Sequence, residues 1–154
     1  MRWRSLTDAV GTIAVVLSLV YVGVQVRQNT SAIQTNTSQS VYTQYSDVIV
    51  PVLESEALAE VISRAGRAPE SMSASDSIQY DMYLNLRINV LEAVYTNSEQ
   101  GTLEVGMARG WLEGMGPWKC RPGGEEYWRA NAANYAPNFR MAMDSAIAVT
   151  ECPT

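Results

Sequence analysis

The stretch AVGTIAVVLSLVYVGVQV, residues 9–26, decides the fold of this 154-residue chain. It contains no charged residue, and ten of its 18 residues are valine, leucine or isoleucine. These ten contribute roughly −3 to −6 kcal/mol to membrane insertion, partly offset by Thr12, Ser18 and Gln25. As a helix the stretch spans roughly 27 Å, which is close to the thickness of a hydrocarbon core. We therefore expect a transmembrane helix here, within an N-terminal segment 1–27.

The segment has two other interpretations. A cleaved signal peptide would also place Arg2 and Arg4 before an apolar run, but no A-x-A-like cleavage site follows Val26. A buried helix of a soluble protein would show a polar stripe at a 3.6-residue period, and this run has none. A membrane anchor explains the pattern better than either alternative.

The charges that flank the segment predict its orientation. Arg2 and Arg4 precede it, whereas Arg27 is the only basic residue after it before Arg64. Positive-inside counting puts the N-terminus in the cytoplasm and the rest of the chain outside it. In a bacterium this predicts a single-pass protein of the inner membrane with a periplasmic C-terminal domain.

Three small residues fall on one face of the predicted anchor. Gly11, Ala14 and Ser18 are spaced i, i+3 and i+7, which would let another transmembrane helix approach closely. Ordinary use of glycine and serine in membrane helices explains the spacing equally well. If the face is used, the anchor contacts a partner helix.

Composition excludes several classes of function. From Arg27 onward there are 9 basic and 15 acidic residues, a formal charge of −6, which argues against nucleic acid as a partner. The chain has no histidine, and Lys119 is its only lysine. The commonest metal ligand and the Ser-His and Cys-His forms of nucleophilic catalysis are therefore absent. We expect no metal, no cofactor and no enzymatic activity.

Beyond the anchor the pattern is helical throughout. Residues 28–44 are rich in Asn, Thr, Ser and Gln, yet Val41, Tyr45 and Val48 keep helical spacing, with Ile49 and Val52 continuing it. We therefore expect a polar stalk helix over 28–53, which Pro51 kinks or ends, followed by a helical domain over 54–154. The expected helices of that domain cover residues 54–65, 76–100, 103–113, 125–135 and 137–149. Gly66 is the expected C′ residue of the first helix, and Gly101 ends the second.

The segment 76–100 is the best candidate for the central core helix. Ser75 is its expected N-cap. The expected core stripe comprises Ile78, Met82, Leu86, Val90 and Val94, widened by Tyr83, Leu91 and Tyr95. The fold class is thus all-α, with one transmembrane helix extended as a stalk and a small helical bundle.

A glycine repeat and two cysteines mark the C-terminal half. Gly106, Gly110 and Gly114 recur every four residues beside large apolar side chains, and 114–124 forms a break. The set could form a partner surface made of Gly106, Met107, Gly110, Trp111, Gly114, Met115 and Trp118. The alternative, which we favour, is that the tryptophans cover the domain's own core.

Cys120 and Cys152 are an even pair in a domain predicted to face an oxidising compartment. A disulfide between them could add about 3 to 4 kcal/mol of stability. Two unpaired thiols in a cytoplasmic domain are the alternative.

Five segments together resemble a widespread group of small bacterial hypothetical proteins. The segments are Gln25-Val26-Arg27-Gln28-Asn29-Thr30, Glu56-Ala57-Leu58-Ala59, Gly101, Pro122-Gly123 through Tyr127-Trp128, and Ala136-Pro137-Asn138-Phe139. Members share an N-terminal transmembrane helix, a Q-x-R-Q-N-T stretch and a helical remainder. The resemblance covers nearly the whole chain and implies no activity and no catalytic residues. This chain departs from the group at Gly110-Trp111 and Cys120, where a longer helix bearing tryptophan is expected.

Three functions follow in decreasing order of support. The first is a non-catalytic accessory subunit of a larger membrane complex, for instance a respiratory or photosynthetic one, which contacts lipid and other subunits through its anchor and domain. The second is a periplasmic ligand-binding or sensing domain, which requires a pocket lined by Tyr83, Tyr95, Trp111 and Trp128. The third is an enzyme using carboxylates such as Glu92 and Glu99, or the adjacent Glu125 and Glu126, although the latter pair suits a helix N-terminus better.

Overall fold

The computed structural model of the chain describes residues 2–152, with side chains from residue 11 onward. The described part contains helices and no strand, so the predicted all-α class is confirmed. The elements are α1 (Arg2–Glu54), α2 (Glu56–Arg67), η1 (Pro69–Ser71), α3 (Ala74–Glu99), α4 (Val105–Leu112), η2 (Gly116–Cys120), α5 (Gly124–Asn131), η3 (Ala132–Asn134) and α6 (Pro137–Val149).

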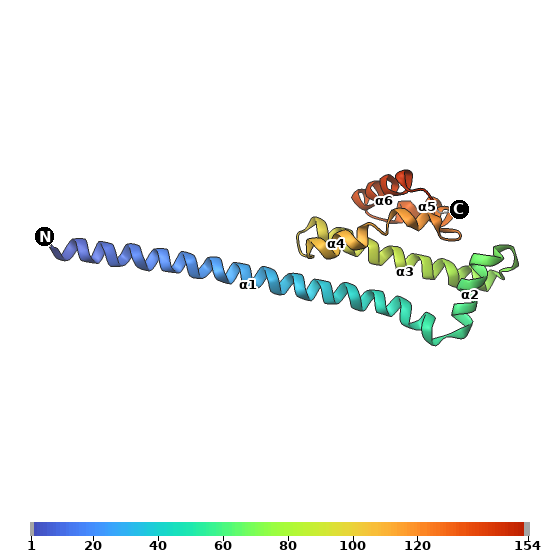
Figure 1. Cartoon of the computed structure of the whole chain (residues 1–154), viewed down its shortest axis with the longest axis horizontal. Helices are drawn as coiled ribbons and strands as arrows, with labels where there is room; N and C mark the ends of the chain where they lie inside the picture. Colours follow the sequence, from blue (N-terminus) through green and yellow to red (C-terminus); the bar gives the residue numbers. More distant parts are fainter. Residues whose placement is uncertain (1, 153–154) are drawn as a thin grey trace.

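Helix α1 is continuous from the apolar segment into the polar one. Its 53 residues correspond to a length of about 80 Å, and its N-terminal part projects away from the rest of the molecule (Figure 1). It is the one helix in the described chain that is long and apolar enough to cross a membrane, and none of its apolar window is buried. Gly11, Ala14 and Ser18 lie in this exposed part, where Ser18 donates a hydrogen bond to the Ala14 carbonyl. The side chains of Arg2 and Arg4 lie outside the described residues.

The outer end of α1 lies one residue beyond the predicted end of the stalk, and Pro51 stands just before it. This proline lies inside the helix, which ends at Glu54. The next residue, Ser55, caps α2 by accepting a hydrogen bond from the Leu58 N–H. The second helix thus begins two residues later than predicted, and Gly66 lies within it rather than after it.

Helix α3 runs back along α1 in the opposite direction (Figure 1). Val41 and Val48 of α1 are buried against Val90 and Val94 of α3, as the spacing of the stalk valines predicts. Leu103 and Ala108 complete this small cluster from the α4 region. The polar stalk therefore pairs with α3 of the domain.

The predicted core stripe of α3 is wrong over its first half. Ile78, Met82 and Leu86 are exposed, at 63%, 61% and 48% of their surface. The residues buried there instead are Tyr80, Leu84 and Ile88, which lie on a different face, whereas Leu91 is buried as predicted. The physical reason is that α3 is apolar on several faces and packs between α1 on one side and α5 and α6 on the other (Figure 1). The predicted N-cap is also wrong, because Ser73 caps α3.

The larger core lies between α2, α3 and the C-terminal elements. Its most deeply buried side chains are those of Leu84, Ile88, Trp118, Phe139 and Met143. Helix α6 spans 137–149 as predicted, whereas the segment 125–135 divides into α5 and η3, and 103–113 shortens to α4. The break at 114–124 contains the 3₁₀ helix η2.

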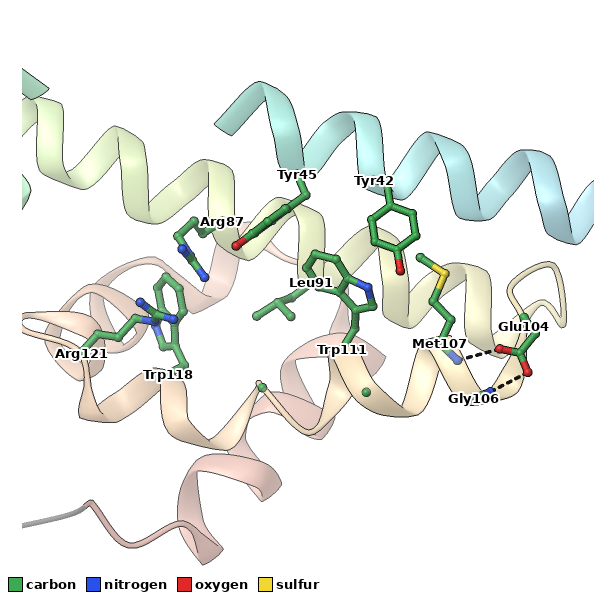
Figure 2. A pocket seen from close by; sticks show the side chains of 12 residues that line it. Tyr42, Tyr45, Arg87, Leu91, Glu104, Gly106, Met107, Trp111, Trp118 and Arg121 are labelled. Carbon is green, nitrogen blue, oxygen red and sulfur yellow. Dashed lines mark hydrogen bonds between the residues drawn. The ribbon is translucent and has the colours of Figure 1, made fainter. Parts of the chain in front are cut away.

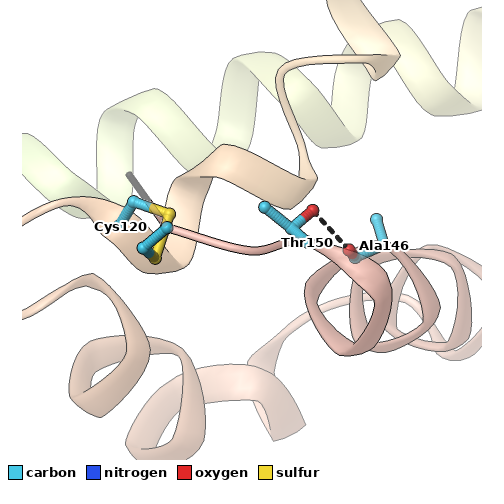
Figure 3. Close-up of a disulfide and its surroundings, with 4 residues drawn as sticks. Cys120, Ala146 and Thr150 are labelled. Atoms are coloured by element: carbon cyan, nitrogen blue, oxygen red, sulfur yellow. Dashed lines mark hydrogen bonds between the residues drawn. A yellow bond between two sulfur atoms is a disulfide. The ribbon is translucent and has the colours of Figure 1, made fainter. Parts of the chain in front are cut away.

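A disulfide ties the end of η2 to the tail after α6. The structure joins Cys120 to Cys152 with their Cα atoms 5.3 Å apart. Nearby, the Thr150 hydroxyl donates to the Ala146 carbonyl (Figure 3). A side chain at Gly116 would overlap that hydroxyl and come within 3.0 Å of the same carbonyl, so only glycine lets η2 approach α6 this closely.

Removing the disulfide should weaken the domain. The bridge closes a loop with a sequence separation of 32 residues, so Cys120→Ser with Cys152→Ser should lower the free energy of unfolding by about 3 to 4 kcal/mol. Urea unfolding of the full chain in detergent micelles measures the loss, and the reduced native chain should match the double variant. Unfolding at the native urea concentration would contradict the predicted contribution.

The capping box of α3 predicts a dependence of stability on pH. The Ser73 N–H donates to the Asp76 carboxylate and lowers its pKa below the usual 3.8, and the Arg64 guanidinium, 2.7 Å away, lowers it further. Because the pKa is lower in the folded than in the unfolded chain, Asp76 stabilises the fold above the unfolded pKa. That contribution is lost as the pH falls through the folded pKa.

Asp76→Asn should therefore be less stable than the native chain at about pH 7, with a difference that shrinks as the carboxylate becomes protonated. Thermal unfolding at a series of pH values measures this difference. Asp81→Asn is the matched control, because Asp81 is exposed on the same helix and accepts no hydrogen bond from the described residues. An unchanged difference down to the lowest pH would contradict the assignment.

Candidate binding site

A cavity of about 510 Å³ lies where α1, α3, α4 and η2 meet. This volume falls within the range of small-molecule sites. It is lined by Tyr42, Tyr45, Arg87, Leu91, Glu104, Gly106, Met107, Gly110, Trp111, Gly114, Trp118 and Arg121 (Figure 2). The stalk and the domain thus build it jointly.

Aromatic rings join the two halves of the cavity wall. The Trp111 ring of α4 meets the Tyr45 ring edge to face, with centroids 5.0 Å apart, and the Tyr42 ring at 6.4 Å (Figure 2). Such pairs add about 0.5–1.5 kcal/mol beyond the area they bury. They fix α4 against α1 and hold the cavity in shape.

The glycine repeat of α4 leaves part of the cavity volume open. A Cβ atom at Gly110 would meet no atom within 4 Å, and one at Gly106 would meet only the Glu104 side chain. Glycine inside a helix costs about 1 kcal/mol relative to alanine. Here its effect is to leave open space where side chains would otherwise fill the cavity.

Two arginines meet at one end of the cavity. Arg87 of α3 donates to the Tyr83 hydroxyl at 3.0 Å, and its Cζ atom lies 5.8 Å from the centre of the Tyr45 ring. Arg121, just after η2, places its Cζ atom 5.8 Å from the centre of the Trp118 ring. Figure 2 shows the two guanidinium groups pointing toward one another beside that ring.

Neither guanidinium has an acidic partner among the residues whose side chains the structure describes. Among residues 11–152 the ion pairs involve Arg64 and Arg129 only. Desolvation lowers the pKa of Arg121, and the positive charge of Arg87 lowers it further. Arginine remains protonated even so, and the two positive charges face each other at one end of the cavity.

The acidic residue of the cavity lies at its other end. Both carboxylate oxygens of Glu104 accept backbone hydrogen bonds, from Gly106 at 3.0 Å and from Met107 at 2.8 Å (Figure 2). These bonds lower its pKa and make it the N-cap of α4. Glu104 is therefore committed to the helix and does not neutralise the arginines.

The structure brings together most of the predicted glycine and tryptophan set. Gly106, Met107, Gly110, Trp111, Gly114 and Trp118 all line the cavity. Met115 is the exception, because its side chain is buried in the main core and cannot present a surface to a partner. Trp118 is also almost fully buried, so it covers the core from one side and the cavity from the other.

The aromatic pocket that the ligand-binding alternative requires is not formed among the described residues. Of its four residues only Trp111 lines the cavity. The Trp128 ring stacks on Tyr135 and donates to Asp144, while the Tyr95 ring lies against Phe139. Six lining residues were not predicted as part of a site: Tyr42, Tyr45, Arg87, Leu91, Glu104 and Arg121. The helical spacing of Tyr45 was a usable signal for its facing the domain, but nothing in the sequence placed the two arginines together.

The acidic residues considered for catalysis lie apart. Glu92 accepts a hydrogen bond from the Ala136 N–H at the start of α6, Glu99 is exposed, and Glu125 pairs with Arg129 on the surface of α5. Among the residues with described side chains no charged group is fully buried and no acidic cluster suits a metal. Nothing in these positions supports acid-base chemistry.

Searches of protein-family models, curated proteins and solved structures found no match to this chain. The resemblance to the group of small bacterial proteins therefore stays a prediction.

The contact between Trp111 and Tyr45 can be measured directly. A double-mutant cycle with Trp111→Ala and Tyr45→Ala should give a coupling energy of about 0.5–1.5 kcal/mol, because each variant removes the same ring pair. Chemical unfolding of the four chains supplies the values. Tyr95→Ala combined with Trp111→Ala is the control. In the described part of the chain the Tyr95 ring contacts Phe139 and not Trp111, so the effects of these two substitutions should add. Additive effects in the Tyr45 cycle would contradict the contact.

Proposed function

We propose that this protein is a non-catalytic, membrane-anchored interaction subunit, held in the membrane by the N-terminal half of α1. The observation that carries the proposal is the exposed state of that segment. Its large apolar side chains from Ile13 to Val26 are 49% to 67% exposed, and none of the apolar window is buried. Apolar surface of this extent requires lipid or other membrane helices around it.

The proposed orientation places the domain outside the cytoplasm. The excess of arginine before the apolar segment supports this side, as does the paired state of Cys120 and Cys152, since disulfides persist in oxidising compartments. In a bacterium this is the periplasmic side of the inner membrane.

The fold then sets the distance between domain and bilayer. The Gln34 side chain donates to the Gly101 carbonyl in the turn between α3 and α4. Gln34 lies about 12 Å along the helix from Val26, so this turn lies just beyond the lipid headgroups. The far end of the domain, at Ser55, lies about 40 Å along the helix from Val26. A rigid stalk of this kind presents one face of the domain at a fixed height.

The proposed contact surface is the groove formed by the exposed stripe of α3 and the neighbouring ends of α1 and α2. Ile78, Met82 and Leu86 form its floor at i, i+4 and i+8, and Val48, Pro51 and Leu58 form its walls. A stripe with this spacing accepts the apolar face of a helix laid along it. We assign that place to a helix of a partner subunit in the same membrane complex.

The test compares two methionines that are equally exposed. A photoreactive benzoylphenylalanine at Met82 should form a crosslink to a second membrane protein in native membranes, whereas one at Met141 on α6 should not. Met82→Glu should reduce the mass of the detergent-extracted complex to that of the lone chain, and Met141→Glu should leave it unchanged. Native mass spectrometry reads both outcomes.

A clean monomer from native membranes, with no co-purifying protein, would contradict the proposal. Equal crosslinking at positions 82 and 141 would contradict the assigned surface.

A further inference from the structure

The cavity between stalk and domain has the features of a site for a small organic anion. Its volume of about 510 Å³ and its walls of Leu91, Met107 and Trp111 suit an apolar body of one or two rings. The guanidinium groups of Arg87 and Arg121 point toward one another at one end, and no carboxylate pairs with either among residues 11–152.

The charge balance makes this arrangement informative. The chain from Arg27 onward carries 15 acidic residues and a formal charge of −6, so acidic partners are abundant. The two guanidinium groups lie together without an acidic partner, and their electrostatic repulsion raises the free energy of the empty cavity. An anion bound between the two guanidinium groups would remove this repulsion and accept hydrogen bonds from both of them.

We propose that the cavity binds an aromatic carboxylate, with its carboxylate between Arg87 and Arg121 and its apolar body against Trp111, Leu91 and Met107. The rings of Tyr45 and Trp118 hold the two guanidinium groups in position from behind. The open space at Gly110 takes the part of the ligand farthest from the charge.

The position of the cavity indicates where such a ligand comes from. Tyr42 lies about 24 Å along α1 from Val26, which is beyond the headgroup layer of a bilayer anchored at the apolar segment. The ligand is therefore a solute of the surrounding aqueous phase, not a lipid. This step rests on the anchoring proposed above, whereas the anion site itself does not, because it shares no residue with the proposed contact groove.

Isothermal titration of the full chain in detergent micelles tests the site with a pair of matched probes. The probes are 1-naphthylacetate and its neutral amide, which have the same body and differ in charge. We expect the carboxylate to bind the native chain at least about tenfold more tightly than the amide, because only the carboxylate has charge-assisted bonds to both arginines. Inorganic phosphate should bind more weakly than naphthylacetate, because it has no apolar body.

Variants locate the binding. Arg87→Gln and Arg121→Gln should each weaken naphthylacetate binding about tenfold or more, while Arg109→Gln, on the exposed side of α4, should leave it unchanged. Gly110→Leu keeps the helix intact and fills the cavity, so it should abolish binding while the thermal unfolding temperature stays the same or rises. This variant tests the site even if an arginine variant fails to fold.

Four results would overturn the proposal. One is no binding of naphthylacetate to the native chain, and another is equal binding of acid and amide. The third is unchanged binding in Arg121→Gln or in a folded Gly110→Leu variant. Phosphate bound more tightly than naphthylacetate would show a site for inorganic anions and would also contradict it.

Discussion

Four valines from two antiparallel helices, Val41 and Val48 of α1 and Val90 and Val94 of α3, pack against one another along the outer half of α1. Most other features depend on this contact. The stalk sequence between residues 27 and 40 is polar and has few domain contacts, so it would not remain helical alone. It is helical because it continues from the apolar segment at one end and from the valine contact at the other, which avoids the cost of a new helix nucleus.

The same contact creates the cavity. Once α3 lies along α1, α4 must cross beside both, and the Trp111 ring reaches Tyr42 and Tyr45 of the stalk. Glycines on α4 keep the space below these rings open, and the end of η2 brings Arg121 opposite Arg87. The disulfide and the close approach at Gly116 hold η2 in place from the other side. The site therefore joins α1 to the C-terminal half of the domain.

Local patterns predicted much of the fold. Three features could be predicted because each depends on neighbours within one helix. They are the apolar segment, the spacing of Val41 and Val48, and the bounds of α6. The buried face of α3 was not, because a helix that packs on several sides has apolar residues on several faces, and periodicity cannot rank them. Its N-cap was decided by Asp76, which completes a capping box with Ser73 rather than with the predicted serine.

The candidate site was predicted only in part, for a related reason. The glycine repeat and Trp111 stand close together in the sequence and could be recognised as a group. Tyr45, Arg87 and Arg121 come from three distant segments and meet only through tertiary packing. No local signal marks an arginine as lacking a carboxylate partner, because that is a property of the assembled structure.

Helix α1 is one rigid helix from the apolar segment to the domain, and a single distance tests this continuity. Spin labels at Gln28 and Val50, both exposed, flank the polar stretch of the stalk. In a continuous helix their Cα atoms are about 33 Å apart, so double electron-electron resonance in lipid nanodiscs should give a narrow distribution near that value. A broad distribution centred near about 26 Å, the value for a flexible linker of this length, would contradict the account.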